Sequence, residues 1–458
     1  MSTVPIFSTL VEYNLSMSKN LKIFIAGYDV MGKNMAGPGM RSLAMASFLS
    51  KHTSVTLSHD SVSEFDNMPE QVTLINEKDV LWDNDKYWRE FDIAMMPGTQ
   101  ILKTPLPKPF PIPLYVDIYD PFILENIELL VDKPSQIRDF EYLRHLKAML
   151  EMLLRADKFI VTGERTRDFF TGLLAGWGLI NPITASGAKF DDLFLVIPFG
   201  IPDEPFINAL AKSKNEIPDF INEQDELIIW AGGLWDWLDP LKAIDAMPLI
   251  LDKRPFAKLL FMGYRHPNKH IPLMETVKQC IDKARKLRLF GNSIIFNEWT
   301  PFSERIVILG RADLGLSLHK KHIETRYAFR TRIMDYIWAG IPMVISGGDN
   351  LALELAIPGV RILEPGADVY EISAIVISSL ETYSDKSRRE KISDDYEMIR
   401  AKYRWSELLK PLLTSIQNPL KLSCDFYTSS FQKLLESFPE VSRPGIITRG
   451  IDKIKRNI

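Results

Sequence analysis

The sequence contains little cysteine, and this scarcity excludes several classes of protein. Cys280 and Cys424 are its two cysteines in 458 residues. Two thiols cannot form a disulfide framework or a cysteine metal site, so the composition is typical of a protein of the reducing cytoplasm. The seven histidines have no metal-ligand spacing, and no Asp-x-Asp pair ends a predicted strand. We therefore expect no metal ion and no bound cofactor.

Long apolar runs and an excess of basic residues are also missing. No stretch approaches the roughly 20 apolar residues that a membrane-spanning helix needs. The first 20 residues lack a basic start and a long apolar centre, so we expect no signal peptide. The net charge of −4 gives no reason to expect a nucleic-acid partner. With 46% apolar and 25% charged residues, the chain has the composition of an ordinary globular protein, which we expect to be cytoplasmic.

Short apolar segments alternate with helical patterns along most of the chain. In the first half the predicted strands are residues 21–27, 55–58, 72–75, 91–96, 113–116, 158–162 and 193–197. In the second half they are residues 227–230, 258–262, 293–297, 312–318, 343–345 and 361–363. Strands that alternate with helices indicate parallel sheets with helices on both faces. We therefore predict an α/β fold in which two Rossmann-like doubly wound domains face each other across a cleft.

A turn-rich segment, residues 198–203, marks the boundary between the two halves. We place the N-terminal domain at residues 1–205 and the C-terminal domain at residues 206–403. Residues 404–458 are predicted to form a helical tail that partly packs back on the N-terminal domain. Residues 446–456 are basic with apolar residues between them, which fits either a solvated helix or a weak peripheral contact with anionic lipid.

Residues 309–347 contain the densest group of charged side chains beside a predicted helix. An apolar strand precedes a polar loop, and the period of the next apolar residues predicts a helix over 331–339 that ends at Gly340. The loop contains one acid and three arginines, namely Glu324, Arg326, Arg330 and Arg332. Parallel sheets bind ligands beyond the carboxyl ends of their strands, and arginines at a helix N-terminus suit phosphate. The alternative is a set of solvated surface arginines.

Two further groups of residues follow predicted strand ends in the first half. Gly37, Gly39 and Arg41 lie after the first strand, and the glycines there do not fit the G-x-G-x-x-G spacing of dinucleotide sites. They could let a ligand approach the backbone while Arg41 faces the cleft, or they could simply permit a wide turn. Asp117 and Asp120 leave another strand end and point into the same crevice, although one of them could instead cap the next helix.

The segment Asp335-Tyr-Ile-Trp-Ala-Gly340-Ile-Pro342 resembles the acid–x–x–x–Ala–Gly–x–Pro signature of retaining family 4 glycosyltransferases, which have the GT-B fold. The segment from Gly37 to Arg41 is similar to the acceptor-side loop of that family, and residues 197–201 are similar to the hinge between its domains. Residues 230–240 and 297–301 are similar to the first turn of the donor domain in a bacterial branch and to the nucleotide-base contact. Roughly residues 21–415 take part in the resemblance.

This resemblance implies an enzyme that moves a sugar from a nucleoside-diphosphate sugar to a hydroxyl of a saccharide, glycolipid or glycan chain. The anomeric configuration would be retained without a metal ion, in the cytoplasm or at the inner face of the membrane. Glu324 would replace the first acid of the family motif, because Tyr327 stands at that position. The implied catalytic residues are Glu324, Asp117 and Asp120. The implied donor-binding residues are Arg265, Arg330, Thr331, Asp335, Trp299 and Gly233, and the acceptor-side residues are Gly37, Gly39 and Arg41.

Two other functions are compatible with the sequence. A nucleotide-sugar 2-epimerase also uses two similar domains, and it would need acids and histidines in the cleft, for which His319 and His322 are available. A catalytically degenerate partner subunit is the third hypothesis. It follows from the turn after the first donor-domain strand, which lacks the Arg and Lys that the family usually has there.

Overall fold

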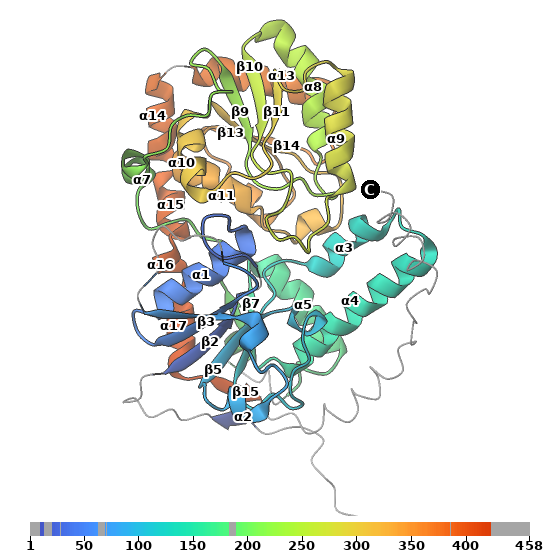
Figure 1. Ribbon diagram of the computed structural model, residues 1–458, viewed down its shortest axis with the longest axis vertical. Helices are drawn as coiled ribbons and strands as arrows, with labels where there is room; N and C mark the ends of the chain where they lie inside the picture. The colour runs from blue at the N-terminus through green and yellow to red at the C-terminus, as the bar shows by residue number, and fades with distance from the viewer. Residues whose placement is uncertain are drawn as a thin grey trace, which may run out of the picture.

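The computed structural model describes residues 10–12, 21–27, 29–62, 69, 71–182, 189–384 and 386–422. These residues form two parallel sheets covered by helices, and Figure 1 shows them as two lobes, one above the other. This arrangement confirms the predicted α/β fold with two doubly wound sheets. The basic segment 446–456 and Cys424 lie outside the described residues. Within the described part of the chain, no helix is both long and apolar enough to span a bilayer.

The N-terminal lobe has a seven-stranded sheet in the order β4-β3-β2-β5-β6-β7-β8. Its strands are β2 (Lys22–Ala26), β3 (Ser54–His59), β4 (Val72–Asn76), β5 (Ile93–Pro97), β6 (Leu114–Asp117), β7 (Lys158–Val161) and β8 (Phe194–Val196). Its helices are α1 (Gly37–Leu49), α2 (Asp85–Trp88), α3 (Phe122–Leu130), α4 (Ser135–Arg155), α5 (Glu164–Gly176) and α6 (Lys189–Asp192). The strand order reverses between β2 and β5, and open α/β sheets bind ligands at such a reversal.

The C-terminal lobe has a six-stranded sheet in the order β11-β10-β9-β12-β13-β14. Its strands are β9 (Glu226–Trp230), β10 (Ala257–Phe261), β11 (Ile294–Phe296), β12 (Leu314–Ser317), β13 (Met343–Ser346) and β14 (Val360–Leu363). Its helices are α7 (Phe206–Lys212), α8 (Pro240–Lys253), α9 (Glu275–Lys286), α10 (Phe302–Arg311), α11 (Thr331–Ala339), α12 (Asn350–Glu354), α13 (Val369–Tyr383), α14 (Lys386–Asp395) and α15 (Glu397–Tyr403). Here the strand order reverses between β9 and β12, so each lobe has one such reversal.

After the second lobe the chain returns to the first. The helices α16 (Trp405–Leu408) and α17 (Lys410–Gln417), red in Figure 1, lie beside the N-terminal sheet. Leu409, Leu412 and Ile416 are fully buried in the core on that side of the sheet. The following strand β15 (Leu420–Leu422) pairs antiparallel with β1 (Leu10–Glu12). The N-terminal lobe is therefore completed by residues from both ends of the chain.

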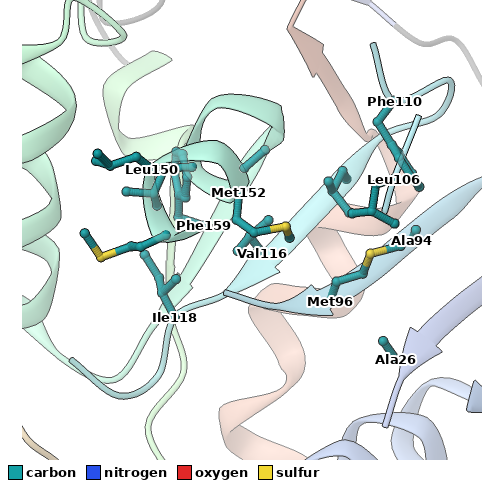
Figure 2. Close-up of a cluster of buried hydrophobic side chains, with 14 of the residues drawn as sticks. Ala26, Ala94, Met96, Leu106, Phe110, Val116, Ile118, Leu150, Met152 and Phe159 are labelled. Atoms are coloured by element: carbon teal, nitrogen blue, oxygen red, sulfur yellow. The ribbon is translucent and has the colours of Figure 1, made fainter. Parts of the chain in front are cut away.

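A large apolar core fixes the strand end from which Asp117 projects. Val116 and Ile118 are buried in this core, and Figure 2 shows them among other apolar side chains of the lobe, including Met152 and Phe159. Side chains alternate between the two faces of a strand, so Asp117 points away from the core that holds its neighbours. The packing therefore presents the carboxylate at the edge of the sheet that faces the second lobe.

A single tyrosine fixes helix α11 against the C-terminal sheet. The Tyr336 hydroxyl is fully buried; it accepts a hydrogen bond from the Ala231 backbone N–H at 3.0 Å and lies 3.0 Å from the Leu316 carbonyl oxygen. The ring needs a glycine beneath it, because a Cβ at Gly315 would lie 2.6 Å from the Tyr336 ring. The position of the helix N-terminus is thus set by contacts with two strands, β9 and β12.

Replacing Tyr336 by phenylalanine should therefore destabilise the fold. The change leaves the buried Ala231 N–H without its partner, which costs roughly 1–3 kcal/mol. Urea denaturation measures the loss as a lower midpoint with an unchanged slope. Tyr142→Phe, at an exposed tyrosine, is the matched control and should be close to neutral. Equal effects of the two substitutions would contradict the role given to the Tyr336 hydroxyl.

Candidate functional site

The two lobes enclose a cavity of about 840 Å³. It lies at the carboxyl ends of the strands where both sheets reverse their order, and its volume is in the range of small-molecule sites. The residues singled out from the sequence that line it are Gly37, Arg41, Asp117, Asp120, Gly233, Trp299, Arg330, Thr331 and Asp335. Gly39, Arg265 and Glu324 do not line it. The structure therefore brings most of the expected residues into one site.

Three arginines from two helices form one side of the cavity, and we call them the arginine wall. Arg330 is the N-cap of α11, Arg332 lies in the first turn of that helix, and Arg305 comes from α10. The side chain of the N-cap residue, Arg330, makes no capping hydrogen bond to α11. Its first N–H groups and its positive dipole end therefore add to the positive potential of the three guanidiniums.

Two members of the arginine wall are held by contacts with the surrounding protein. Arg332 donates a hydrogen bond of 3.0 Å to the backbone oxygen of Gly233, and its guanidinium lies 4.8 Å from the centre of the Trp230 ring. Arg305 lies 3.2 Å from the carboxylate of Asp335, the acid of the signature that the sequence suggested. Burial raises the pKa of Asp335, and the positive charges of Arg305 and Arg332 oppose this shift.

The arginine wall retains capacity to bind an anion. Burial, and then the charges of Arg330 and Arg305, lower the pKa of Arg332 to about 10, although Tyr336 and Asp335 oppose the shift. The Nε atoms of Arg305 and Arg330 and the Nη1 atom of Arg332 are buried, and each lacks a hydrogen-bond partner among the described residues. Unpartnered N–H groups in a crowded cationic site favour a ligand with several negatively charged oxygens.

Glu324 does not occupy the position that the sequence suggested. We expected it to reach the cleft as a catalytic acid, but its side chain is fully buried and lies outside the cavity lining. It forms a two-pronged ion pair with Arg330, with N···O distances of 2.8 and 2.5 Å. The placement of Glu324 at the reacting sugar is therefore corrected. The carboxylate neutralises and orients Arg330, which does line the cavity.

On the opposite side of the cavity, Asp117 is held by a buried arginine. Arg41 binds the Asp117 carboxylate through two hydrogen bonds of 2.7 and 3.0 Å. Two further N–H groups donate to the carbonyl oxygens of Ile197 and Pro198, at 3.0 and 3.1 Å. Arg41 is 1% exposed. It therefore connects the strand end to the segment where the chain crosses between lobes, and four of its five N–H groups are used in these contacts.

The acceptor-side glycines lie in a helix and not in a loop, because α1 begins at Gly37. Gly37 lines the cavity, whereas Gly39 does not. A Cβ at Gly39 would lie 2.7 Å from the carbonyl oxygen of Val30, so this glycine lets the helix approach the preceding segment closely. The expectation that Gly39 exposes backbone to a ligand is corrected to a packing role.

Asp120 and Glu125 lie on the N-terminal side of the cavity and form no ion pair among the described residues. We call them the acid pair. Burial, and then the charge of Asp117, raise the pKa of Asp120 to about 7. Burial and the neighbouring Asp120 also raise the pKa of Glu125 well above its ordinary value. Both acids line the cavity. A carboxyl group with a pKa near 7, such as that of Asp120, can either accept or donate a hydrogen bond or proton, as transfer reactions require.

Four aromatic residues form a further part of the lining, and we call them the aromatic wall: Trp235, Trp237, His266 and Trp299. The rings of Trp235 and Trp237 stack at 5.2 Å with an interplanar angle of 8°. A Cβ at Gly233 would lie 2.9 Å from the Trp235 ring, so this glycine supports the indole. The indole N–H of Trp299 is buried without a hydrogen-bond partner among the described residues. A flat ring with a hydrogen-bond acceptor, such as a nucleobase, suits this surface.

Several solved structures resemble this chain in their fold. No family model matches the chain, and no curated protein matches it. WaaG, a glycosyltransferase involved in lipopolysaccharide biosynthesis, superposes with a TM-score of 0.57 at 13% sequence identity. HepE from Anabaena, in complex with UDP-glucose, gives 0.57 at 15%, and an α-glucosyltransferase in complex with UDP-glucose and DNA gives 0.52 at 14%. Each match covers 86% of this chain and 99% of the other.

The chain has the GT-B fold. This follows from the two parallel sheets together with the near-complete coverage of these structures. Because one fold supports many activities, the function must be argued from the cleft itself. The GT-B cleft of this chain has an arginine wall and an aromatic wall in its C-terminal lobe and the acid pair in its N-terminal lobe.

Arg265 lies outside the GT-B cleft, which corrects its assignment as a diphosphate ligand. Its side chain is 58% exposed and pairs with Glu298 at 3.3 Å. The next residue, His266, lines the cleft instead. Sequence reasoning also missed Arg305, and it named Arg332 among the loop arginines without assigning it to donor binding. The signal available in the sequence was the place of Arg305 near the start of a helix that follows a strand. There the positive end of the helix dipole and the guanidinium both favour an anion.

The histidines considered for an epimerase do not reach the GT-B cleft. His319 is buried beside Ser317, and burial, followed by the charge of Arg330, lowers its pKa well below the ordinary value. His322 lies 3.1 Å from Glu128 of the other lobe. Neither of the two lines the cavity. Both have a structural role in this arrangement.

Removing Arg330 should destabilise the fold strongly. Arg330→Ala leaves the carboxylate of Glu324 buried without its partner, which costs about 3–5 kcal/mol. Arg326→Ala, at an exposed arginine of the same loop, should change the free energy of unfolding by at most about 0.5 kcal/mol. The double variant Arg330→Met with Glu324→Leu should lose less than Arg330→Ala, because no charge is left buried. Urea denaturation of the three variants tests this order, and a mild Arg330→Ala phenotype would contradict it.

The acid pair should make stability depend on pH. The ordinary pKa of Asp120 is 3.8 and its folded pKa is about 7. Between these values the folded chain holds more protons than the unfolded chain, so the free energy of unfolding falls as pH rises. Asp120→Asn removes this contribution, so it should stabilise the protein relative to wild type more at pH 8 than at pH 5. Denaturation at the two pH values checks the difference, and an equal effect at both would refute the shifted pKa.

Proposed function

We propose that this chain is a retaining, metal-independent glycosyltransferase of family 4, which transfers a sugar from a nucleoside-diphosphate sugar to a hydroxyl acceptor. The arginine wall is the observation that supports this most strongly. Three guanidiniums, each with one buried N–H group that lacks a partner among the described residues, line the cavity of a GT-B cleft beside the N-terminus of α11. A diphosphate matches that site in charge and in the number of acceptor oxygens.

The arginine wall is suited to the chemistry of the leaving group. When the bond between the sugar and the diphosphate breaks, negative charge grows on the departing phosphate oxygen. Fixed donors aimed at that charge stabilise the transition state more than the ground state. Arg332 is the principal donor in this proposal, since its partners are a carbonyl oxygen and an indole face and neither neutralises it. In this proposal Arg330 and Thr331 bind the diphosphate from the start of α11.

The remaining donor contacts follow from the same geometry. In the proposal, Asp335 accepts hydrogen bonds from the ribose beside Arg305, and the aromatic wall holds the base. HepE and the α-glucosyltransferase of similar fold were each solved with UDP-glucose. We therefore propose a uridine diphosphate sugar as the first donor to test.

The N-terminal side would hold the reacting sugar and the acceptor. We assign hydroxyl binding to the acid pair, because Asp117 is already neutralised by Arg41. Asp120 is the better candidate of the two predicted aspartates for accepting a hydroxyl proton, given its pKa of about 7. A saccharide or a lipid-linked saccharide is the proposed acceptor class, with transfer in the cytoplasm or at the inner face of the membrane.

A degenerate partner subunit is the second candidate. The observation that favours it is Gly233, which stands in the turn where the resembled family has a cation. In the structure Arg332 donates to the Gly233 oxygen, so a guanidinium reaches that turn from a different helix. We therefore favour a nucleotide-binding enzyme over a degenerate subunit.

Binding of a nucleoside diphosphate should depend on Arg332 and not on Arg265. Thermal shift with the diphosphates of uridine, guanosine, thymidine, adenosine and cytidine selects the preferred base, since binding to the native state raises apparent stability. Arg332→Gln should weaken the preferred diphosphate about 10- to 100-fold in titration calorimetry, through loss of charge-assisted hydrogen bonds. Arg265→Ala, the exposed control, should bind like wild type. Failure of wild type to bind any of the five would refute the proposed function.

A further inference from the structure

A buried polar contact joins the two lobes beside the aromatic wall. Asp29, in the segment after β2 of the N-terminal lobe, is 2% exposed. Asn268, in the segment after β10 of the other lobe, donates a hydrogen bond of 3.2 Å to Asp29 Oδ1. His266 Nε2 lies 3.7 Å from Asp29 Oδ2. Asp29 Oδ2 has no hydrogen-bond partner among the described residues, so one oxygen of a buried carboxylate still needs a donor.

The hydrogen bonds of His266 determine which nitrogen can be that donor. His266 Nδ1 accepts a hydrogen bond from the Asn268 backbone N–H at 3.1 Å, so Nδ1 carries no hydrogen. The hydrogen of the neutral ring is therefore on Nε2, which faces Asp29. Burial lowers the pKa of His266, against the charge of Asp29, which favours this neutral form. A closing movement that shortens 3.7 Å to the usual N–H···O distance of about 3.0 Å would complete the hydrogen bond.

His266 transmits this contact to the aromatic wall. Its ring centre lies 5.9 Å from that of Trp235 and 5.8 Å from that of Trp299. All three side chains line the cavity, whereas Asp29 lies behind them. A Cβ at Gly263 would lie 2.9 Å from the Trp299 ring, so this indole rests on backbone and is confined between Gly263 and His266. The orientation of His266 therefore affects two rings that face the ligand.

We propose that Asp29 is a positioning residue for the nucleotide. When the lobes close, its Oδ2 accepts the Nε2–H of His266, and the imidazole then holds Trp235 and Trp299 in the arrangement that receives the base. The N-terminal lobe thus contributes to the orientation of the aromatic wall, whose four residues belong to the C-terminal lobe. This inference rests on the proposed binding of a nucleoside diphosphate, and it adds a residue and an inter-lobe contact to it.

A second carboxylate–histidine pair on the same rim provides a matched control. Asp60 Oδ2 lies 4.0 Å from His270 Nε2, and again the two residues come from opposite lobes. The His270 side chain is 82% exposed. Its ring is solvated and can adopt other orientations, so removing Asp60 changes the charge of the rim without changing the orientation of the aromatic wall.

The test is a double-mutant cycle on binding of the diphosphate that the wild-type protein prefers. Asp29→Ala and His266→Ala should each raise the dissociation constant roughly tenfold in titration calorimetry, the range expected for a hydrogen bond to a charged group. The double variant should bind no more weakly than either single variant, because Asp29 acts through His266. Asp60→Ala should bind like wild type.

The outcomes separate this inference from the proposed function. If wild type binds a diphosphate but Asp29→Ala binds equally well, or if the two single effects multiply in the double variant, the positioning role is refuted while the proposed function stands. If wild type binds none of the five diphosphates, both are refuted. Thermal midpoints report whether each variant is folded. Should Asp29→Ala fail to fold, Asp29→Asn replaces it, because the amide keeps the Asn268 contact and cannot accept from Nε2–H through its NH2 group.

Discussion

Positive charge crowded at the N-terminus of α11 is the constraint to which much of the second lobe is adapted. Burying guanidiniums side by side is unfavourable, because each loses hydration and repels the others. Glu324 offsets the charge of Arg330 and Asp335 that of Arg305, while Arg332 has a carbonyl oxygen and an indole face. Helix α11 cannot move away from the other positive charges, because the Tyr336 hydroxyl binds the backbone at Ala231 and Leu316. The folded protein therefore keeps a positive potential at this site. An anionic ligand would reduce the electrostatic repulsion among the guanidiniums.

In the N-terminal lobe, too, a buried counter-ion holds a charged side chain of the cavity lining, but there the lining residue is the acid. Arg41 is a fully buried counter-ion for Asp117, as Glu324 is for Arg330. Arg41 also binds the carbonyl oxygens of residues 197–198, where the chain leaves the first lobe. A Cβ at Gly200 would lie 2.6 Å from the Trp405 ring, so the two crossings between the lobes pack directly against each other. Arg41 thus connects the strand end that carries Asp117 to the segment between the two lobes.

Hydrophobic period was sufficient to predict the strands of both sheets and helix α11, because buried strands and amphipathic helices leave a direct pattern in the sequence. The charged helix start and the family resemblance singled out Arg330, Thr331 and Asp335, and these three residues line the cavity. The errors have a different origin. Adjacent residues in an irregular segment can face opposite ways, so Arg265 is exposed and His266 lines the cleft. Glu324 was misplaced because a charged residue in a loop was assumed to be solvated, whereas a partner six positions later allows complete burial. Arg305 joins the arginine wall because α10 packs beside α11, and its place near the start of a helix does not by itself show that packing.

Several polar groups of the cleft are satisfied by neither lobe alone. The buried N–H groups of the arginine wall and of Trp299, and Oδ2 of Asp29, lack hydrogen-bond partners among the described residues. Leaving such groups unpaired is unfavourable, so any event that supplies partners to several of them at once is favoured. A nucleoside diphosphate could serve the N–H groups, and closure of the lobes could serve Asp29 through His266. If both happen together, ligand binding stabilises the closed form by the difference in its affinity for the two forms. In the proposed reaction, closure would also exclude water from the bond between the sugar and the diphosphate, so that the acceptor hydroxyl, and not water, receives the sugar.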